Sequence, residues 1–260
     1  MTQPLLVSIE DGIATLTLNR PAVGNALDMP MARALLEAAI RCDQDESIRC
    51  VVLTGTGKLF CGGGDLQAFA EAGDAMPAFF SELAGLLHMT VTRLMRMPKP
   101  LLVAVNGSTG GGGMSLALAG DIVIAARSAS FTTAHSSVGL STDVGMSWHL
   151  PRLVGLRRAQ DMILTNRRIS AEEAERIGLI TRVVDDAALM QERESYARKL
   201  AMAPVSALGR SRALLIESFN SPLEQQLERE VRAVVSSARS EESREGIQAF
   251  LEKRKPTFVK

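Results

Sequence analysis

The sequence predicts an α/β protein with a mostly parallel sheet, followed by a helical segment towards the C-terminus. Over about the first 126 residues, short runs of branched apolar residues alternate with stretches of helical apolar spacing. Alternation of this kind is typical of crossover connections between parallel strands. Beyond about residue 155 the apolar spacing is helical throughout. The 260 residues, 46% of them apolar and 22% charged, are enough for one large core in a globular protein.

The first elements are predicted to form a hairpin. Residues 5–9 and Ile13–Leu18 alternate in polarity around Asp11-Gly12, which has the composition of a two-residue hairpin turn. A helix is expected over 31–40, with Asp28 as its N-terminal cap. The strands that follow are short and rich in branched residues, which indicates burial. They are expected at 48–54, 101–105 and 122–126, with helices over 77–97 and 114–119 between them.

The remainder of the chain is predicted to be helical. Ser170 begins a sequence typical of a capping box, and Pro204 and Pro222 separate the later helices. No linker rich in Ser, Gly or Pro divides this part from the α/β part. We therefore expect an α/β core over residues 1–200 and a helical region over 201–260, packed on the core or on another subunit. The predicted helices are 156–164, 171–177, 189–202, 205–219, 223–237 and 242–253.

Composition argues against several classes of function. With 29 basic and 29 acidic side chains the formal net charge is zero, which disfavours nucleic-acid binding through bulk electrostatics. Three cysteines are too few for a disulfide framework and no secretory signal is visible, so a reducing, cytoplasmic location is expected. About twenty uncharged residues follow Lys99, but glycines 110–113 make a membrane span unfavourable. No cluster of His, Cys and carboxylates has the spacing of a metal site.

Two glycine runs are the strongest chemical signal. Glycines 62–64 follow the predicted strand 48–54, and glycines 110–113 follow the strand 101–105 and open a helix. Glycine lets a ligand approach the backbone closely, and amides at a helix N-terminus lack intrahelical acceptors. The runs match neither a P-loop nor a dinucleotide-binding motif, and no nucleophile-elbow sequence is present. They are either tight turns or, as their common position after buried strands favours, one shared anion site.

Several motifs along nearly the whole chain resemble one family. They are Asn25-Ala26-Leu27, residues 60–66, Asn106-Gly107 with its glycine run, residues 151–155, residues 169–174 with Gly178-Leu179, and residues 245–256. In this order and spacing they resemble the crotonase superfamily, the enoyl-CoA hydratases and isomerases. The resemblance implies a crotonase-like stack of β-β-α units, a C-terminal helical trimerisation region, and a homotrimer or a hexamer of two trimers. The implied ligand is an acyl-coenzyme A thioester, with no cofactor beyond its coenzyme A moiety.

The resemblance also implies roles for individual residues. The amides of Gly64 and Gly112 resemble the oxyanion hole that holds the thioester oxygen as it becomes an enolate. One preorganised donor of this kind is typically worth about 2.7–4 kcal/mol. Phe250 and Lys253 resemble positions that contact the nucleotide end of coenzyme A, often across a subunit boundary. Further coenzyme A contacts are expected from Asn25, Ala26, Gly62, Asp65 and Leu66.

The chain departs from the family at the residues that add water. Hydratases of the family place two glutamates around that water, and the matching positions here are Ser115 and His135. Asp143 stands where several isomerases of the family carry a single acid/base. One carboxylate that reaches both C2 and C4 can move a double bond from C3 to C2, so isomerisation of a 3-enoyl-CoA is the leading hypothesis. The alternative for Asp143 is a cap on the helix that begins near Gly145.

Other functions are also considered. A dehalogenase branch of the superfamily pairs a nucleophilic Asp at the Asp143 position with a His base at the His88 position. The low aromatic content, 4% of residues, offers no obvious ring-binding pocket for such a substrate. Enoyl-CoA hydration and a non-catalytic acyl-CoA or RNA-binding scaffold are further alternatives. Cys61 and His149 are expected to be packing residues.

Overall fold

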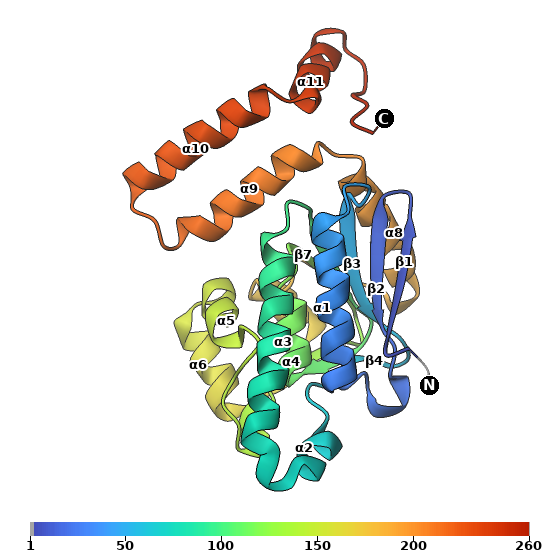
Figure 1. Ribbon diagram of the computed structural model, residues 1–260, viewed down its shortest axis with the longest axis vertical. Coiled ribbons are helices and arrows are strands. Elements are labelled where there is room, and N and C mark those ends of the chain that lie inside the picture. Colours follow the sequence, from blue (N-terminus) through green and yellow to red (C-terminus); the bar gives the residue numbers. More distant parts are fainter. Residues whose placement is uncertain (1–2, 260) are drawn as a thin grey trace.

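Two β-sheets form the body of the protein in the computed structural model, which describes residues 3–259 (Figure 1). The larger sheet has the strand order β1-β2-β3-β5-β7-β10, and the smaller has the order β4-β6-β8-β9. β1 pairs antiparallel with β2, and the other neighbours in the larger sheet are parallel. The arrangement confirms the predicted α/β class and the predicted N-terminal hairpin.

The strands of the two sheets differ in length. The larger sheet contains β1 (Leu5–Glu10), β2 (Ile13–Leu18), β3 (Cys50–Gly55), β5 (Leu101–Val105), β7 (Ile122–Ala126) and β10 (Arg182–Val184). The smaller sheet contains β4 (Leu59–Cys61), β6 (Ser108–Gly110), β8 (Ser130–Thr132) and β9 (Ile169–Ser170). The sequence prediction lacks the smaller sheet and β10, because two or three residues are too few for a periodic pattern.

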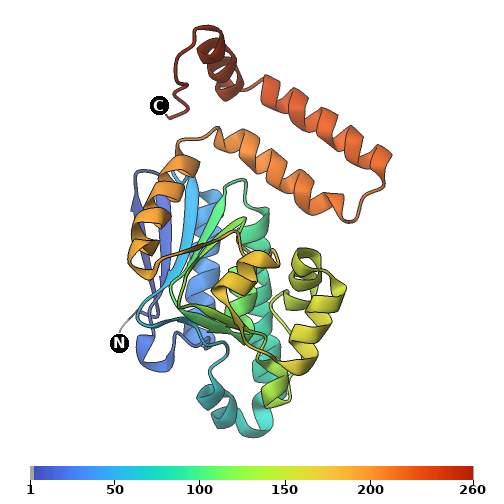
Figure 2. The ribbon, with the colours of Figure 1, turned by 180° about the vertical axis from the view of Figure 1, so that it is seen from behind.

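Helices cover both faces of the larger sheet. α1 (Met29–Gln44) and α3 (Met76–Arg96) pack together on one face, and α8 (Leu189–Ala201) packs on the other (Figures 1 and 2). Asp28 caps α1 as predicted, with its carboxylate accepting from Met31 N at 2.8 Å. The other helices are α2 (Leu66–Ala72), α4 (Gly111–Leu118), α5 (Met146–Val154), α6 (Leu156–Thr165), α7 (Ala171–Arg176), α9 (Val205–Ser218), α10 (Leu223–Ala238) and α11 (Glu241–Leu251).

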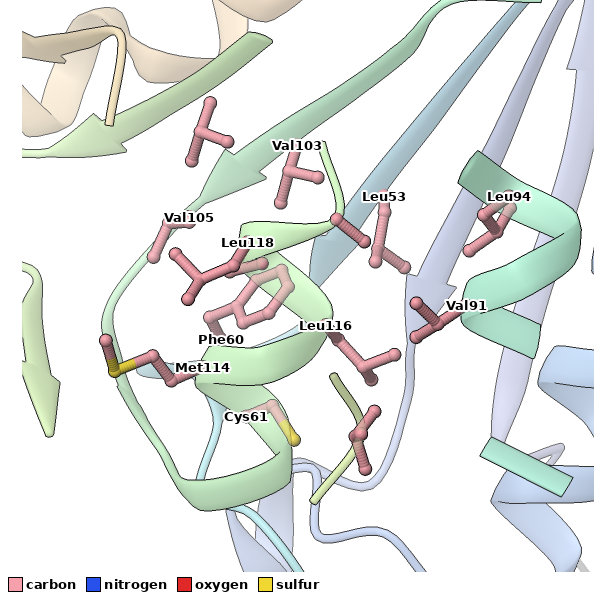
Figure 3. Packing of buried hydrophobic residues seen from close by; sticks show 14 of the residues in the cluster. Leu53, Phe60, Cys61, Val91, Leu94, Val103, Val105, Met114, Leu116 and Leu118 are labelled. Atoms are coloured by element: carbon pink, nitrogen blue, oxygen red, sulfur yellow. The ribbon is translucent and has the colours of Figure 1, made fainter. Parts of the chain in front are cut away.

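The helix α4 is buried along its whole length. Figure 3 shows Leu116 and Leu118 of α4 among core side chains that include Phe60 of β4 and Val103 of β5, all of them nearly inaccessible to solvent. Because α4 lies in this core, its N-terminal turn lies within the protein body and not on its outer surface.

The three C-terminal helices extend away from the two sheets. In Figures 1 and 2, α9 and α10 run side by side in opposite directions, and α11 lies at the end of this pair opposite the turn that joins them. The expected division after residue 200 falls at the end of α8, which is Ala201. Among residues 3–259, no helix combines the length and apolar character that crossing a membrane requires.

Arg212 of α9 connects this helical region to the core. Its guanidinium is buried, pairs with Asp121 at 2.7 Å and donates to the main-chain oxygens of Met97 and Leu94. Burial raises the pKa of Asp121, and the Arg212 charge opposes that rise. The ion pair therefore stabilises the ionised form of the partly exposed Asp121 carboxylate.

We expect Arg212→Met to lower the free energy of unfolding by about 2–4 kcal/mol. It removes the positive partner of the Asp121 carboxylate, which keeps only the hydrogen bond from Leu101 N, and it leaves two carbonyls without their donor. The value is below that of a fully buried pair since the Asp121 side chain keeps 30% exposure. Urea unfolding followed by fluorescence measures the change. The control is Arg210→Met on the same helix, where a change of less than about 1 kcal/mol is expected. Equal effects of the two substitutions would contradict this role for Arg212.

Candidate active site

A cavity opens between the N-terminus of α4, the loop before α2, the helix α3 and the segment 134–144. It encloses about 750 Å³, part of it open to solvent. Four of the residues predicted to be catalytic line it: Gly64, Gly112, His135 and Asp143. Two of the predicted coenzyme A contacts, Gly62 and Leu66, also belong to its wall. The structure thus brings both glycine runs and the carboxylate to one place.

The loop before α2 leaves the Gly64 N–H without a hydrogen bond to Leu27, the residue it pairs with. In a parallel bridge between Leu27 and Gly64, Leu27 N donates to Gly63 O at 2.8 Å and Asp65 N donates to Leu27 O at 3.0 Å. The bridge uses the groups on either side of Gly64, so the Gly64 N–H points away from Leu27. A Cβ at Gly64 would lie 2.3 Å from the Phe69 ring, which explains why glycine occupies this position.

Glycines 110–113 bring the first turn of α4 against the same loop. A Cβ at Gly113 would lie 2.4 Å from Cys61 O, so the close contact between α4 and the end of β4 requires glycine. The N-terminal cap of α4 is Gly110, which has no side chain that could accept from the amides of the first turn. Amides in the first turn have no intrahelical acceptor, and the helix dipole adds partial positive charge there. Gly112 therefore offers an N–H that suits a developing negative charge in the cavity wall.

Asp143 supplies the only carboxylate among the described residues that line the cavity. Its Oδ1 lies 2.9 Å from His135 Nε2, and the two side chains are 34% and 8% exposed. Gly145 is the N-terminal cap of α5, and no side chain caps that helix. The alternative interpretation of Asp143 as a helix cap is therefore wrong.

The main chain around Asp143 is held from both sides. Ser115 Oγ donates to Asp143 O at 3.1 Å, and Val144 N donates to His88 Nε2 at 3.2 Å. Val144 has φ +50°, a conformation that is rare for a β-branched residue and persists only where the surroundings enforce it. Two residues from the sequence analysis, Ser115 and His88, thus fix the position of the Asp143 backbone.

His88, for which the dehalogenase alternative predicts a catalytic role, does not lie in the cavity wall. Its side chain is exposed on α3, and its Nε2 lone pair accepts the Val144 amide hydrogen. A base for water would need that lone pair free. His88 therefore lies next to the catalytic candidates in space, but its imidazole accepts a hydrogen bond from the main chain at Val144.

Aromatic side chains gather at the cavity, which corrects an argument made from composition. Phe69 and Phe80 both line the wall, with ring centroids 4.4 Å apart, and Phe79 lies 5.9 Å from Phe69. Three of the eight phenylalanines therefore meet here despite the low overall aromatic content. The rings come from α2 and α3, and only the packing of these two helices brings them together.

The remaining predicted coenzyme A contacts near the N-terminus form a buried support. The Asn25 side chain is inaccessible to solvent and donates to the carbonyl oxygens of Thr56, Leu59 and Phe60. Arg20 donates to Ala26 O at 2.7 Å and pairs with Asp65 at 2.9 Å.

The side chains of Asn25 and Asp65 therefore hold the glycine loop in place, and neither they nor Ala26 reach the cavity wall. The sequence analysis missed Arg20, which links these residues, because no local pattern marks it.

Phe250 and Lys253 lie outside the cavity wall within one chain. Phe250 is 83% exposed on α11, and Lys253 follows that helix with φ +54°. Figure 1 places α11 at the opposite end of the molecule from α2. A contact between these two residues and a ligand in this cavity would have to come from another subunit.

The surroundings of the buried Cys61 make its thiol unreactive. Its thiol contacts Asn25 O at 3.1 Å, and burial raises its pKa to about 12. A thiol of this kind is not a nucleophile at neutral pH. Among residues 3–259, no group of three or more His, Cys, Asp or Glu side chains is arranged to hold a metal ion.

His149 is buried on α5, outside the cavity wall, and its burial has a consequence for stability. Burial, with help from the nearby Arg152 charge, lowers the pKa of His149 to about 4. Between pH 6.5 and 4 the unfolded chain therefore binds more protons than the folded one, so stability falls as the pH falls through this window.

When the pH falls from 7 to 5, the protonation of His149 in the unfolded chain should lower the free energy of unfolding by about 2 kcal/mol. Urea unfolding of wild type and His149→Gln at both pH values isolates this contribution, since the variant lacks it. An unchanged pH dependence in the variant would contradict the assignment.

Comparison with known proteins gives this geometry a context. Residues 8–260 match the family model described as enoyl-CoA hydratase/isomerase. The chain belongs to this family. The match confirms the resemblance found in the sequence and makes the protein an enzyme of the enoyl-CoA hydratase/isomerase type.

Members similar to this chain carry different reactions in their names. The 1,2-epoxyphenylacetyl-CoA isomerase of Escherichia coli K12 is 40% identical over 100% of this chain and 99% of its own length. The 4-chlorobenzoyl coenzyme A dehalogenase-2 of Arthrobacter sp is 36% identical over 89% of this chain and 85% of its own. The crystal structure of an enoyl-CoA hydratase from Polaromonas sp. JS666 is 34% identical, with a TM-score of 0.93 and coverage of 97% and 98%. Family membership therefore establishes the type of enzyme, and its specific reaction has to be inferred from the residues of the site.

Proposed function

We propose that this enoyl-CoA hydratase/isomerase family enzyme isomerises a 3-enoyl-CoA to a 2-enoyl-CoA with Asp143 as its single acid/base. The observation that carries the proposal is the composition of the cavity wall, where the Asp143 carboxylate shares one cavity with Gly64 and Gly112. Ser115, at the position of one water-binding glutamate, donates to the Asp143 main chain and lies outside the wall. A second carboxylate for activating water is absent from the described lining residues.

The reaction needs one group that moves a proton between two carbons. The ionised Asp143 removes a proton from C2, and the electrons of the C2–H bond pass to the thioester oxygen. The N–H groups of Gly64 and Gly112 donate to that oxygen and hold the dienolate. The protonated Asp143 then returns the proton to C4, and the double bond lies between C2 and C3. Atoms and charge balance without water or a redox partner.

The first test is a direct assay for double-bond migration. Purified enzyme with a 3-enoyl-CoA should form the conjugated 2-enoyl-CoA, which is followed by the absorbance of the conjugated thioester. Crotonyl-CoA in the same buffer should stay unhydrated. Rapid hydration of crotonyl-CoA, with no isomerisation of the 3-enoyl-CoA, would overturn the proposal.

A second candidate is hydrolytic dehalogenation of an aromatic acyl-CoA. Phe69 and Phe80 in the cavity wall favour an aromatic ring, and a named dehalogenase is among the similar proteins. In that reaction Asp143 attacks the ring carbon, the halide leaves, and water then hydrolyses the aryl ester. The engaged Nε2 of His88 argues against it as the base for that water. Halide release from 4-chlorobenzoyl-CoA tests this candidate in the same series of assays.

We further propose a homotrimer, or a hexamer made of two trimers, in the cytoplasm. Large apolar side chains on the C-terminal helices are exposed in the single chain, which favours their burial against other copies. They include Leu215, Phe219, Leu223, Val231, Val234, Ile247 and Phe250. Analytical ultracentrifugation should give three or six times the chain mass, and a monomer would contradict this assembly.

A further inference from the structure

His135 approaches the Asp143 carboxylate from a rigid part of the main chain. It begins the 3-10 turn His135–Val138, where His135 N donates to Thr133 O at 2.8 Å and Leu140 N donates to His135 O at 3.0 Å. The side chain is 92% buried, because 8% of its surface is exposed. Water therefore competes little for the 2.9 Å contact between Nε2 and Asp143 Oδ1.

The other ring nitrogen indicates where the proton resides. His135 Nδ1 is buried and has no hydrogen-bond partner among residues 3–259. A buried N–H without an acceptor is less tolerable than a buried lone pair without a donor. An ionised carboxylate can only accept. The proton therefore resides on Nε2, which donates to Asp143 Oδ1.

This hydrogen bond makes the two oxygens of the Asp143 carboxylate different. Oδ1 is held by His135, and no hydrogen bond to Oδ2 is present among residues 3–259. Ser115 and His88 already hold the main chain at residues 143 and 144. The remaining freedom of Asp143 is rotation of its side chain, and the bond from His135 removes it.

We propose that His135 is a positioning residue whose Nε2–H holds Oδ1 of Asp143, so that Oδ2 exchanges the proton with C2 and C4 of the substrate. The proposal rests on the function proposed above. Hydratases of the family carry their second glutamate at this position, and here His135 takes a different role there. Because Nε2 is engaged by Asp143 and Nδ1 is buried, His135 supports the single acid/base and is not a second one.

Kinetics on the full-length enzyme tests the role. His135→Phe keeps a ring but removes the donor, and we expect kcat to fall about 10–100-fold with KM within about 3-fold, since positioning acts on the chemical step. His135→Gln keeps an N–H donor at a similar distance from the main chain. If His135→Phe lowers kcat about 100-fold, kcat of His135→Gln should be at least about 10-fold higher than that of His135→Phe. The control is Ser136→Ala, an exposed neighbour outside the cavity wall, with wild-type kinetics expected. Wild-type kcat in His135→Phe, or no recovery in His135→Gln, would overturn the proposal.

Nitrogen NMR of histidine-labelled protein tests the contact without relying on activity. The protein has three histidines, and the His135→Gln spectrum assigns the signal that disappears. We expect a proton on Nε2 of His135, and a shift of that N–H resonance in Asp143→Ala. A proton on Nδ1, or no response to Asp143→Ala, would overturn the proposal. Should the wild type fail to isomerise, the proposed function fails while this spectrum still decides whether His135 holds Asp143.

Discussion

Asp143→Asn should lower kcat for isomerisation by about 10³-fold, because the amide can neither remove the C2 proton nor return one to C4. Asn has nearly the same size, and its Oδ1 can still accept the His135 Nε2–H at the observed position. We therefore expect the fold and the affinity for acyl-CoA to change little. The measurement is the initial rate of conjugated product formation from a 3-enoyl-CoA at saturating substrate.

Two controls accompany this substitution. Asp74→Asn changes an exposed carboxylate outside the cavity wall and should leave the rate unchanged. Thermal unfolding and titration with an acyl-CoA show whether the Asp143→Asn protein is intact. An intact Asp143→Asn enzyme that isomerises at the wild-type rate would show that another group moves the proton.

Removing the Gly64 amide hydrogen should lower kcat/KM by about 10²–10³-fold, the effect typical of one oxyanion donor. Gly64→Pro removes this hydrogen, but any Cβ at this position meets the Phe69 ring at 2.3 Å. The informative comparison is therefore Gly64→Pro against Gly64→Ala, both in a Phe69→Ala background. The two double variants share the added Cβ and differ chiefly in the N–H and in the ring that replaces it.

The Leu27 bridge makes this comparison interpretable. It uses Gly63 O and Asp65 N but not Gly64 N, so proline at 64 removes no hydrogen bond of the bridge. We expect both double variants to have similar melting temperatures and similar affinity for free coenzyme A. Equal kcat/KM values in two folded double variants would contradict a role for the Gly64 amide.

Much of the fold was predictable because its signals are local. The hairpin follows from alternation around Asp11-Gly12, and the buried strands β5 and β7 follow from short runs of branched residues. The smaller sheet was not predictable, because its strands have two or three residues and are defined by their partners. Family resemblance supplied the order of units that periodicity alone leaves open.

The candidate site was predictable in its glycines and less so in its side chains. The glycine runs mark where backbone amides are accessible, and the structure brings Gly64 and Gly112 to one cavity. The contact between His135 and Asp143 depends on Ala134 and Val144 at φ +60° and +50°, conformations that these residue types rarely adopt. No local rule predicts such a path, so the contact and the structural task of His88 appear only in three dimensions.

The central claim is that one carboxyl group, that of Asp143, serves both C2 and C4. Isomerisation in ordinary water of a 3-enoyl-CoA carrying deuterium at C2 tests it most directly, with NMR of the product at C4. Because the Asp143 side chain is two-thirds buried, 34% exposed, the deuterium it accepts should in part be delivered to C4 before exchange with water. The account predicts measurable transfer of label from C2 to C4 within one molecule. A product whose C4 carries only hydrogen from the solvent would contradict it.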